Sequence, residues 1–93
     1  MAVMTDDAVA AALAAREGWE REGDAIVKRF TREGGFVGAV AFVDALVAPA
    51  ERMNHHPDLE IGWNTVTVRL STHSEGGITE RDLALADEID RLA

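Results

Sequence analysis

The hydrophobic period of the chain changes at Pro57, and this change constrains the fold more than any other feature. Before Pro57, apolar residues recur at the helical spacings of four, three and four. After Pro57 they occupy every second position, as in half-buried strands. The helical stripe is Phe36, Val40, Val43 and Val47, widened by Ala39, Phe42 and Leu46, and the alternating residues are Leu59, Ile61, Trp63, Val66, Val68 and Leu70. The pattern predicts a helix and then two strands, antiparallel around Asn64.

Pro49 complicates the end of this central helix. Inside a helix, a proline removes one backbone donor and clashes with the preceding turn. We therefore expect a kink at Pro49, or a helix that ends shortly before Glu51.

The N-terminal third of the chain contains a helix and a hairpin. Thr5 can cap the helix, and Gly18 is expected to end it. Two short strands, residues 19–21 and 25–31, then surround a turn that contains Gly23.

The last helix has the clearest boundary of all. Thr79 is a natural cap with Asp82 three positions later, and Ile78 and Leu83 are placed to form a hydrophobic staple. The complete order is α-β-β-α-β-β-α. It predicts an α+β two-layer sandwich, a four-stranded antiparallel sheet with helices on one face, built as one domain over residues 1–93.

Composition excludes several classes of function. The net charge of -8 repels phosphate backbones, so we expect no direct nucleic-acid binding. No apolar run approaches the length of a membrane span, no signal peptide is recognisable, and cysteine is absent. We expect a soluble cytoplasmic protein. The small core of a 93-residue chain makes a homo-oligomer physically reasonable.

All three histidines fall in two short segments. His55 and His56 precede Pro57 where the helix gives way to a strand, and His73 follows the second strand of the predicted hairpin. A hairpin would bring them toward one place, with Glu51 one helical turn before His55. Since histidine is the side chain with an ordinary pKa nearest neutrality, this grouping indicates proton-transfer chemistry.

Other interpretations of these residues remain open. Histidines also serve as surface or capping residues, and three histidines with a glutamate suit zinc, although the adjacent pair His55–His56 is a poor chelator. Neither a nucleophile motif nor a phosphate-binding glycine loop is present. Trp63 is expected in the core, whereas Trp19 could lie in the core or wall an aromatic pocket.

The sequence resembles the pterin-4a-carbinolamine dehydratases, also known as dimerisation cofactors of a liver homeodomain transcription factor. The resemblance covers nearly the whole chain from Trp19 onward. The residues that carry it are Glu51, His55-His56-Pro57, Trp63, Leu70-Ser71-Thr72-His73, Thr79-Glu80-Arg81-Asp82 and the segment from Trp19 through Glu22-Gly23-Asp24-Ala25-Ile26 to Phe30.

The resemblance implies the same fold and a specific reaction. A 4a-hydroxytetrahydropterin, left by an aromatic amino acid hydroxylase, loses water to give the quinonoid dihydropterin in tetrahydrobiopterin recycling. This hydro-lyase activity (4a-hydroxytetrahydrobiopterin dehydratase, EC 4.2.1.96) needs no metal or organic cofactor. It needs one acid and one base of near-neutral pKa, which imidazoles supply. A homodimer or homotetramer is also implied.

Roles for individual residues follow from the same resemblance. His55 and His73 look like the acid–base pair, His56 like a substrate-orienting group with some part in proton transfer, and Glu51 like a partner of a histidine or of the pterin. The candidate substrate-binding residues are Asn54, His55, His56, Ser71, Thr72, His73, Ser74, Trp19, Arg81 and Asp82, the last two as a pair at the rim.

The sequence departs from the family pattern at several places. Leu59 stands where many members carry tryptophan, Asn54 where aspartate is frequent, and the early hairpin is shorter than in animal members.

Two alternative functions remain: a non-catalytic dimerisation or assembly module on the same fold, and a small metal-binding protein.

Overall fold

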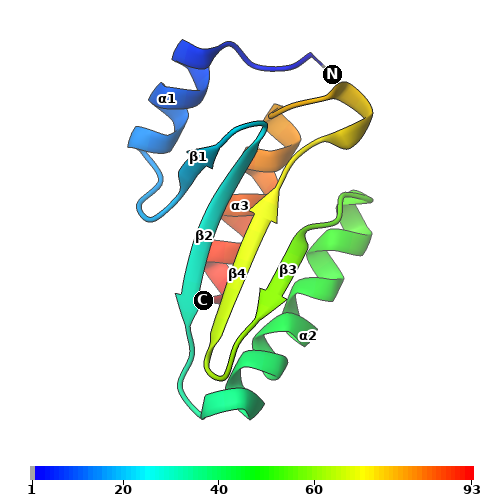
Figure 1. Cartoon of the computed structure of the whole chain (residues 1–93). Coiled ribbons are helices and arrows are strands. Elements are labelled where there is room, and N and C mark those ends of the chain that lie inside the picture. Colours follow the sequence, from blue (N-terminus) through cyan, green and yellow to red (C-terminus); the bar gives the residue numbers. More distant parts are fainter. Residues whose placement is uncertain (1) are drawn as a thin grey trace.

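A computed structural model describes residues 2–93, and its elements follow the order predicted from the sequence (Figure 1). The helices are α1 (Asp6–Ala14), α2 (Gly35–Met53) and α3 (Glu80–Leu92), and a short 3-10 helix, η1 (His73–Glu75), lies before α3. The strands are β1 (Glu20–Glu22), β2 (Ala25–Thr31), β3 (Asp58–Ile61) and β4 (Thr65–Leu70). The predicted α+β class is confirmed.

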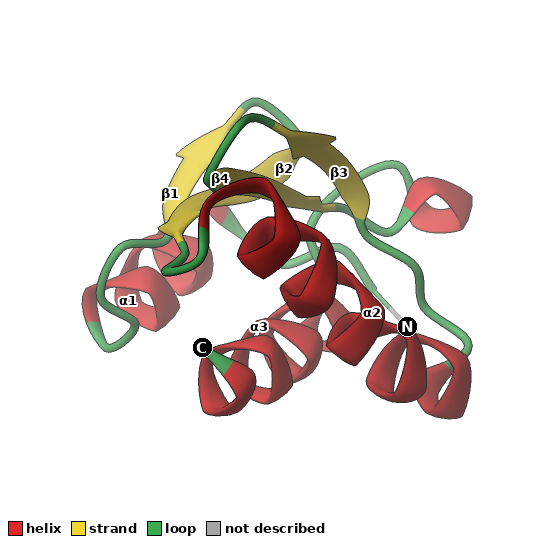
Figure 2. Cartoon of the chain, turned by 90° about the horizontal axis from the view of Figure 1, so that it is seen from below, coloured by secondary structure: helices red, strands yellow, loops and turns green. Residues whose placement is uncertain are grey.

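The four strands form one antiparallel sheet in the order β1-β2-β4-β3. The helices lie on one side of this sheet, which leaves the other side open (Figure 2). In the register of the central pair, Ile26 lies opposite Leu70 and Phe30 opposite Val66. All four side chains are buried. This face of the sheet therefore forms one side of the core, and α2 and α3 pack against it.

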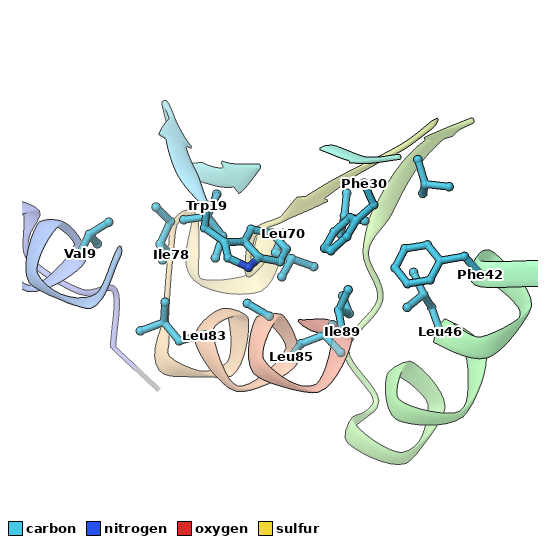
Figure 3. Packing of buried hydrophobic residues seen from close by; sticks show 14 of the residues in the cluster. Val9, Trp19, Phe30, Phe42, Leu46, Leu70, Ile78, Leu83, Leu85 and Ile89 are labelled. Atoms are coloured by element: carbon cyan, nitrogen blue, oxygen red, sulfur yellow. The ribbon is translucent and has the colours of Figure 1, made fainter. Parts of the chain in front are cut away.

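The core combines this sheet face with one stripe of α3 (Figure 3). Leu85 and Ile89 are completely buried, as their helical spacing predicts. The start of α3 is fixed by a capping box, in which the Thr79 hydroxyl and the Asp82 carboxylate each accept from backbone N–H groups. The N-terminal cap Thr5 is likewise confirmed, but α1 ends at Ala14, well before the predicted stop.

Helix α2 buries only part of the predicted apolar stripe. Its buried residues include Ala39, Phe42 and Leu46, whereas Phe36 and Val47 are exposed. Both sets have helical spacing, so the sequence pattern could not decide between two adjacent apolar faces.

The prediction that α2 might end before Glu51 is wrong, because the helix continues through Pro49 to Met53. Pro49 itself is buried and packs as an apolar residue. Proline has no N–H group to donate to the carbonyl of Ala45, four residues earlier. Ala45 is exposed, so water can satisfy this carbonyl. Within residues 2–93, no helix is both long and apolar enough to cross a membrane.

Strand β3 is an edge strand, and its apolar residues are more exposed than their alternation suggested. Leu59 and Ile61 pair with Val68 and Val66 and therefore share the core face, yet both remain exposed. Trp63, expected in the core, is 73% exposed and lies in the turn after the strand. The alternation predicted the correct face but not that the edge is incompletely covered.

Candidate active site

Three chain segments meet at one end of the sheet: the C-terminus of α2, the turn between β4 and α3, and the N-terminus of α3. Asn54 ends α2 in the left-handed conformation (φ 47°, ψ 46°), which asparagine tolerates better than most residues. The next N–H group, of His55, donates to the carbonyl of Ala50. Because of this tight cap, the chain turns toward α3 directly after α2, and the His55 side chain lies against the start of α3.

His55 is buried, and its partner is the carboxylate of Asp82. The two residues are 7% and 0% exposed, and Nε2 of His55 lies 2.5 Å from Oδ1 of Asp82. The sequence placed Asp82 at the rim of the site, but the structure places it beneath the site. Asp82 lies in the first turn of α3, where the helix dipole favours a carboxylate, and it faces the His55 ring as a hydrogen-bond partner.

Two threonines complete the surroundings of Asp82. Its Oδ2 accepts from the Thr72 hydroxyl at 2.9 Å and from the backbone N–H of Thr79 at 2.9 Å. The two hydroxyls are themselves 2.7 Å apart. Thr72, a candidate pterin contact, is 2% exposed with its hydroxyl directed to this network, so its side chain supports the site from below.

His56 lies on the outside and has a different partner. Its Nε2 lies 2.5 Å from Oε2 of Glu51, and both side chains are mostly exposed. The Glu51 carboxylate is thus the partner of His56 and not of His55. Both residues line a mainly apolar cavity of about 230 Å³ between α2 and β3, with Leu59 on its opposite wall.

His73 has a third carboxylate partner. It opens η1, is exposed, and its Nε2 lies 3.6 Å from Oδ2 of Asp58 at the start of β3. Because β3 and β4 form the predicted antiparallel hairpin, the end of β4 returns to the segment that follows His56. Each histidine therefore has its own carboxylate, where the sequence had suggested Glu51 for one of them.

The remaining candidates near His73 have varied surroundings. His73, Asp58 and Ser71 line a cavity of about 270 Å³ together with Asp24. The Ser71 hydroxyl donates to the backbone carbonyl of Asp24 at 2.7 Å. Ser74 is exposed in η1. Contact of these residues with a pterin stays a prediction.

Arg81 joins the two helix ends of the site. Its guanidinium donates to the backbone carbonyls of Met53 and Asn54, at 3.1 and 2.8 Å. These carbonyls lie at the C-terminus of α2, where helical donors are missing and a cation is favoured. Arg81 thus fastens the chain just before His55 to the start of α3.

Trp19 lies in the core, at a distance from the histidines. It is 3% exposed, packs edge-on against Phe30, and donates from Nε1 to Asp90 at 3.0 Å. Asp90 and Asp82 are eight residues apart on α3, which corresponds to about 12 Å along the helix. Of the two environments open to Trp19, the structure therefore shows the core.

The described residues contain no group of three His, Cys, Asp or Glu side chains that could hold a metal ion. Each imidazole instead pairs with one carboxylate, an arrangement suited to proton transfer. Sequence reasoning missed Asp58 and assigned Thr79 only a capping role. The register of the hairpin was the signal for Asp58, since it brings the start of β3 to the end of β4.

Comparison with known proteins identifies the family. The family model described as pterin 4 alpha carbinolamine dehydratase matches residues 2–92. The chain belongs to this family. A Mycobacteroides abscessus relative, provisionally named pterin-4-alpha-carbinolamine dehydratase, is 51% identical over 97% of this chain and 95% of its own length. A relative from Thermosynechococcus vestitus with the same provisional name is also 51% identical, over 91% and 88% of the two chains.

Solved structures of similar proteins share the fold of this chain. A crystal structure titled transcriptional coactivator/pterin dehydratase, from Brucella melitensis, superposes with a TM-score of 0.92 at 33% identity, covering 98% of each chain. A second structure is titled a pterin dehydratase-like protein identified as a RuBisCO assembly factor in the alpha-carboxysome. It has a TM-score of 0.63 at 30% identity and covers 81% of this chain and 86% of its own.

Proposed function

We propose that this protein is a 4a-hydroxytetrahydropterin dehydratase, a hydro-lyase (EC 4.2.1.96) acting in tetrahydrobiopterin recycling. Membership of the family supports the reaction class. The observation that carries the proposal is the pairing of His55 with Asp82 and of His73 with Asp58 at the same end of the sheet. Two imidazoles with separate carboxylates can hold different protonation states, as an acid and a base must.

The reaction requires one proton to leave N5 and one to reach the hydroxyl on C4a. The N5–H electron pair forms the C4a=N5 double bond while the C4a–O bond breaks and water departs, so no oxidant is needed. In the proposal, His55 and His73 are the catalytic base and acid in an order still to be assigned. His56, held by Glu51, orients the pterin.

The proposal includes no metal or organic cofactor, as the resemblance implies, and the cytoplasmic location that the sequence composition led us to expect. Direct nucleic-acid binding is disfavoured by the net charge of -8. Asn54, Ser71 and Ser74 are proposed to contact the pterin ring from the rim.

The first experiment follows the absorbance change when enzymatically generated 4a-hydroxytetrahydropterin is dehydrated. Wild type should accelerate the step over buffer, and His55→Ala and His73→Ala should each lose 10²-fold or more, about the usual contribution of acid–base catalysis. Thr65→Val, at the far end of β4, is the control and should leave the rate unchanged. No acceleration by wild type would contradict the proposal.

A homodimer or homotetramer is the proposed assembly, supported by exposed apolar residues on α2 and around the β3 edge. These are Phe36, Val37, Val40, Val47, Leu59, Ile61 and Trp63. A second copy would cover this apolar surface and the open edge of β3, which otherwise invites unspecific pairing. Sedimentation velocity should show an oligomer that Val37→Asp, at a 78% exposed position, dissociates. A monomeric wild type would contradict this.

The second candidate function is a binding or assembly module without catalysis. One observation favours it, namely that a structural neighbour with 30% identity is titled a RuBisCO assembly factor. If wild type folds but adds nothing to the uncatalysed rate, this function replaces the dehydratase.

A further inference from the structure

The buried polar cluster beneath His55 has a fixed direction of hydrogen bonding. The cluster consists of His55, Thr72, Thr79 and Asp82, and these residues come from three separate elements or turns. Thr79 and Asp82 are completely buried, and Thr72 is nearly so. Buried polar groups must satisfy one another, so each proton in the cluster can be assigned by counting donors and acceptors.

The count begins at Asp82. Its Oδ2 receives the Thr79 N–H and the Thr72 hydroxyl proton. Thr72 has no second hydroxyl proton, so in the 2.7 Å contact between the two hydroxyls Thr79 must donate and Thr72 must accept. Thr79 in turn accepts the backbone N–H of Arg81 at 3.2 Å. In this series of hydrogen bonds, from the Arg81 N–H through the Thr79 and Thr72 hydroxyls, each donor therefore points toward the Asp82 carboxylate.

The consequence falls on His55. The Asp82 side chain already receives two donors at Oδ2, and an ionised carboxylate only accepts hydrogen bonds. The ring nitrogen facing Oδ1, Nε2 of His55, must therefore carry the proton. Across residues 2–93, no buried side-chain nitrogen or oxygen lacks a hydrogen-bond partner. Since only Nε2 of this ring is bonded, Nδ1 reaches solvent.

We propose that Thr72 and Thr79 are positioning residues that, through Asp82, lock His55 in the tautomer protonated on Nε2, so that Nδ1 is the atom that exchanges a proton with substrate. The catalytic significance of this lock rests on the proposed dehydratase function. The tautomer itself is a property of the free protein and can be measured without substrate.

Asp82→Asn gives a sharp test because the cluster dictates how the amide must orient. Two donors converge on the position of Oδ2, so the amide oxygen should take that position and the NH₂ group should face His55. Nε2 must then accept, and the proton moves to Nδ1. Long-range ¹H–¹⁵N spectra of ¹⁵N-labelled protein, recorded at alkaline pH, should show protonated Nε2 in wild type and protonated Nδ1 in Asp82→Asn.

The kinetic effect should follow the tautomer. With Nδ1 blocked, kcat of Asp82→Asn should fall on the order of 10⁴-fold, the loss that a wrong histidine tautomer causes in a serine protease. Near-UV circular dichroism should remain that of wild type.

Thr72→Val tests the hydroxyl relay without changing the carboxylate, in case Asp82→Asn does not fold. It is nearly isosteric and removes one donor from Oδ2. We expect kcat to fall about tenfold with KM unchanged, a fraction of the full acid–base contribution. Thr72→Ser should restore the rate, and Thr65→Val, the same substitution at the other end of β4, should have no effect.

Three results would overturn the inference: protonated Nδ1 in wild type, an unchanged tautomer in a folded Asp82→Asn, or Thr72→Val kinetics equal to those of Thr65→Val. An inactive wild type would defeat the dehydratase proposal instead, and the spectra would still decide the tautomer.

Discussion

Nε2 of His55 and Oδ1 of Asp82 lie 2.5 Å apart, although the residues are separated by 27 positions. His55 follows the C-terminus of α2, and Asp82 lies in the first turn of α3. This contact joins the two helices that cover the sheet at the end where all three histidines lie. It is buried, whereas the pairs His56–Glu51 and His73–Asp58 are exposed. One imidazole is thus fixed by the fold, and two remain free to respond to a ligand.

Asp82→Ala should be the most destabilising single change near the site. It leaves His55 Nε2, the Thr72 hydroxyl and the Thr79 N–H without their acceptor, and the free energy of unfolding should fall by about 3 kcal/mol. Urea denaturation measures the change. Asp87→Ala is the matched control on the same helix, since it removes the partly exposed pair with Arg16 and should cost less than about 1 kcal/mol. Equal losses in the two variants would contradict the role given to the buried cluster.

His56→Ala should affect substrate binding more than stability. The side chain is 57% exposed, so the midpoint of urea unfolding should stay within error of wild type. If His56 orients the pterin, KM should rise about tenfold, the result of losing a hydrogen bond to substrate, while kcat changes less. Glu51→Gln should show a weaker form of the same effect. A loss confined to kcat would instead make His56 a proton-transferring residue.

Much of the fold could be predicted because the decisive signals are local. The capping box at Thr79 and the alternation of Val66, Val68 and Leu70 depend on residues close in sequence, and both are confirmed. Which part of the apolar stripe of α2 faces the core could not be predicted, because its two adjacent rows of residues have the same period. The prediction that Trp63 lies in the core is wrong, because alternation shows which face a residue is on but not how far along a strand the helices cover that face.

The grouping of the histidines could be predicted from the sequence, but their carboxylate partners could not. The period change at Pro57 predicts a helix followed by a hairpin, and this order places the histidines at one end of the sheet. Which carboxylate reaches which imidazole depends on the angle between α2 and α3 and on the Asn54 cap. Neither leaves a local pattern, so Asp82 was assigned to the rim.

Trp19→Phe should weaken the fold and leave the site intact. The smaller phenyl ring keeps only part of the apolar contacts, and the hydrogen bond from Nε1 to Asp90, which also binds the ammonium group of Lys28, is lost. We expect the free energy of unfolding to fall by about 1–2 kcal/mol, with kcat and KM unchanged. Kinetic assays and urea denaturation of the same samples provide the comparison. A raised KM would return Trp19 to the substrate-binding residues.

Arg81→Ala should loosen the segment that carries His55. The guanidinium holds the carbonyls of Met53 and Asn54, and without it the end of α2 loses two of the donors that satisfy it. Hydrogen exchange of the amides at residues 54 and 55 should accelerate about tenfold, equivalent to about 1.4 kcal/mol of local stability. Arg91→Ala, whose 3.2 Å ion pair with Glu88 lies on the exposed end of α3, should leave those amides unchanged. If both variants exchange alike at residues 54 and 55, Arg81 does not fasten the helices, and the position of His55 depends on the Asp82 cluster alone.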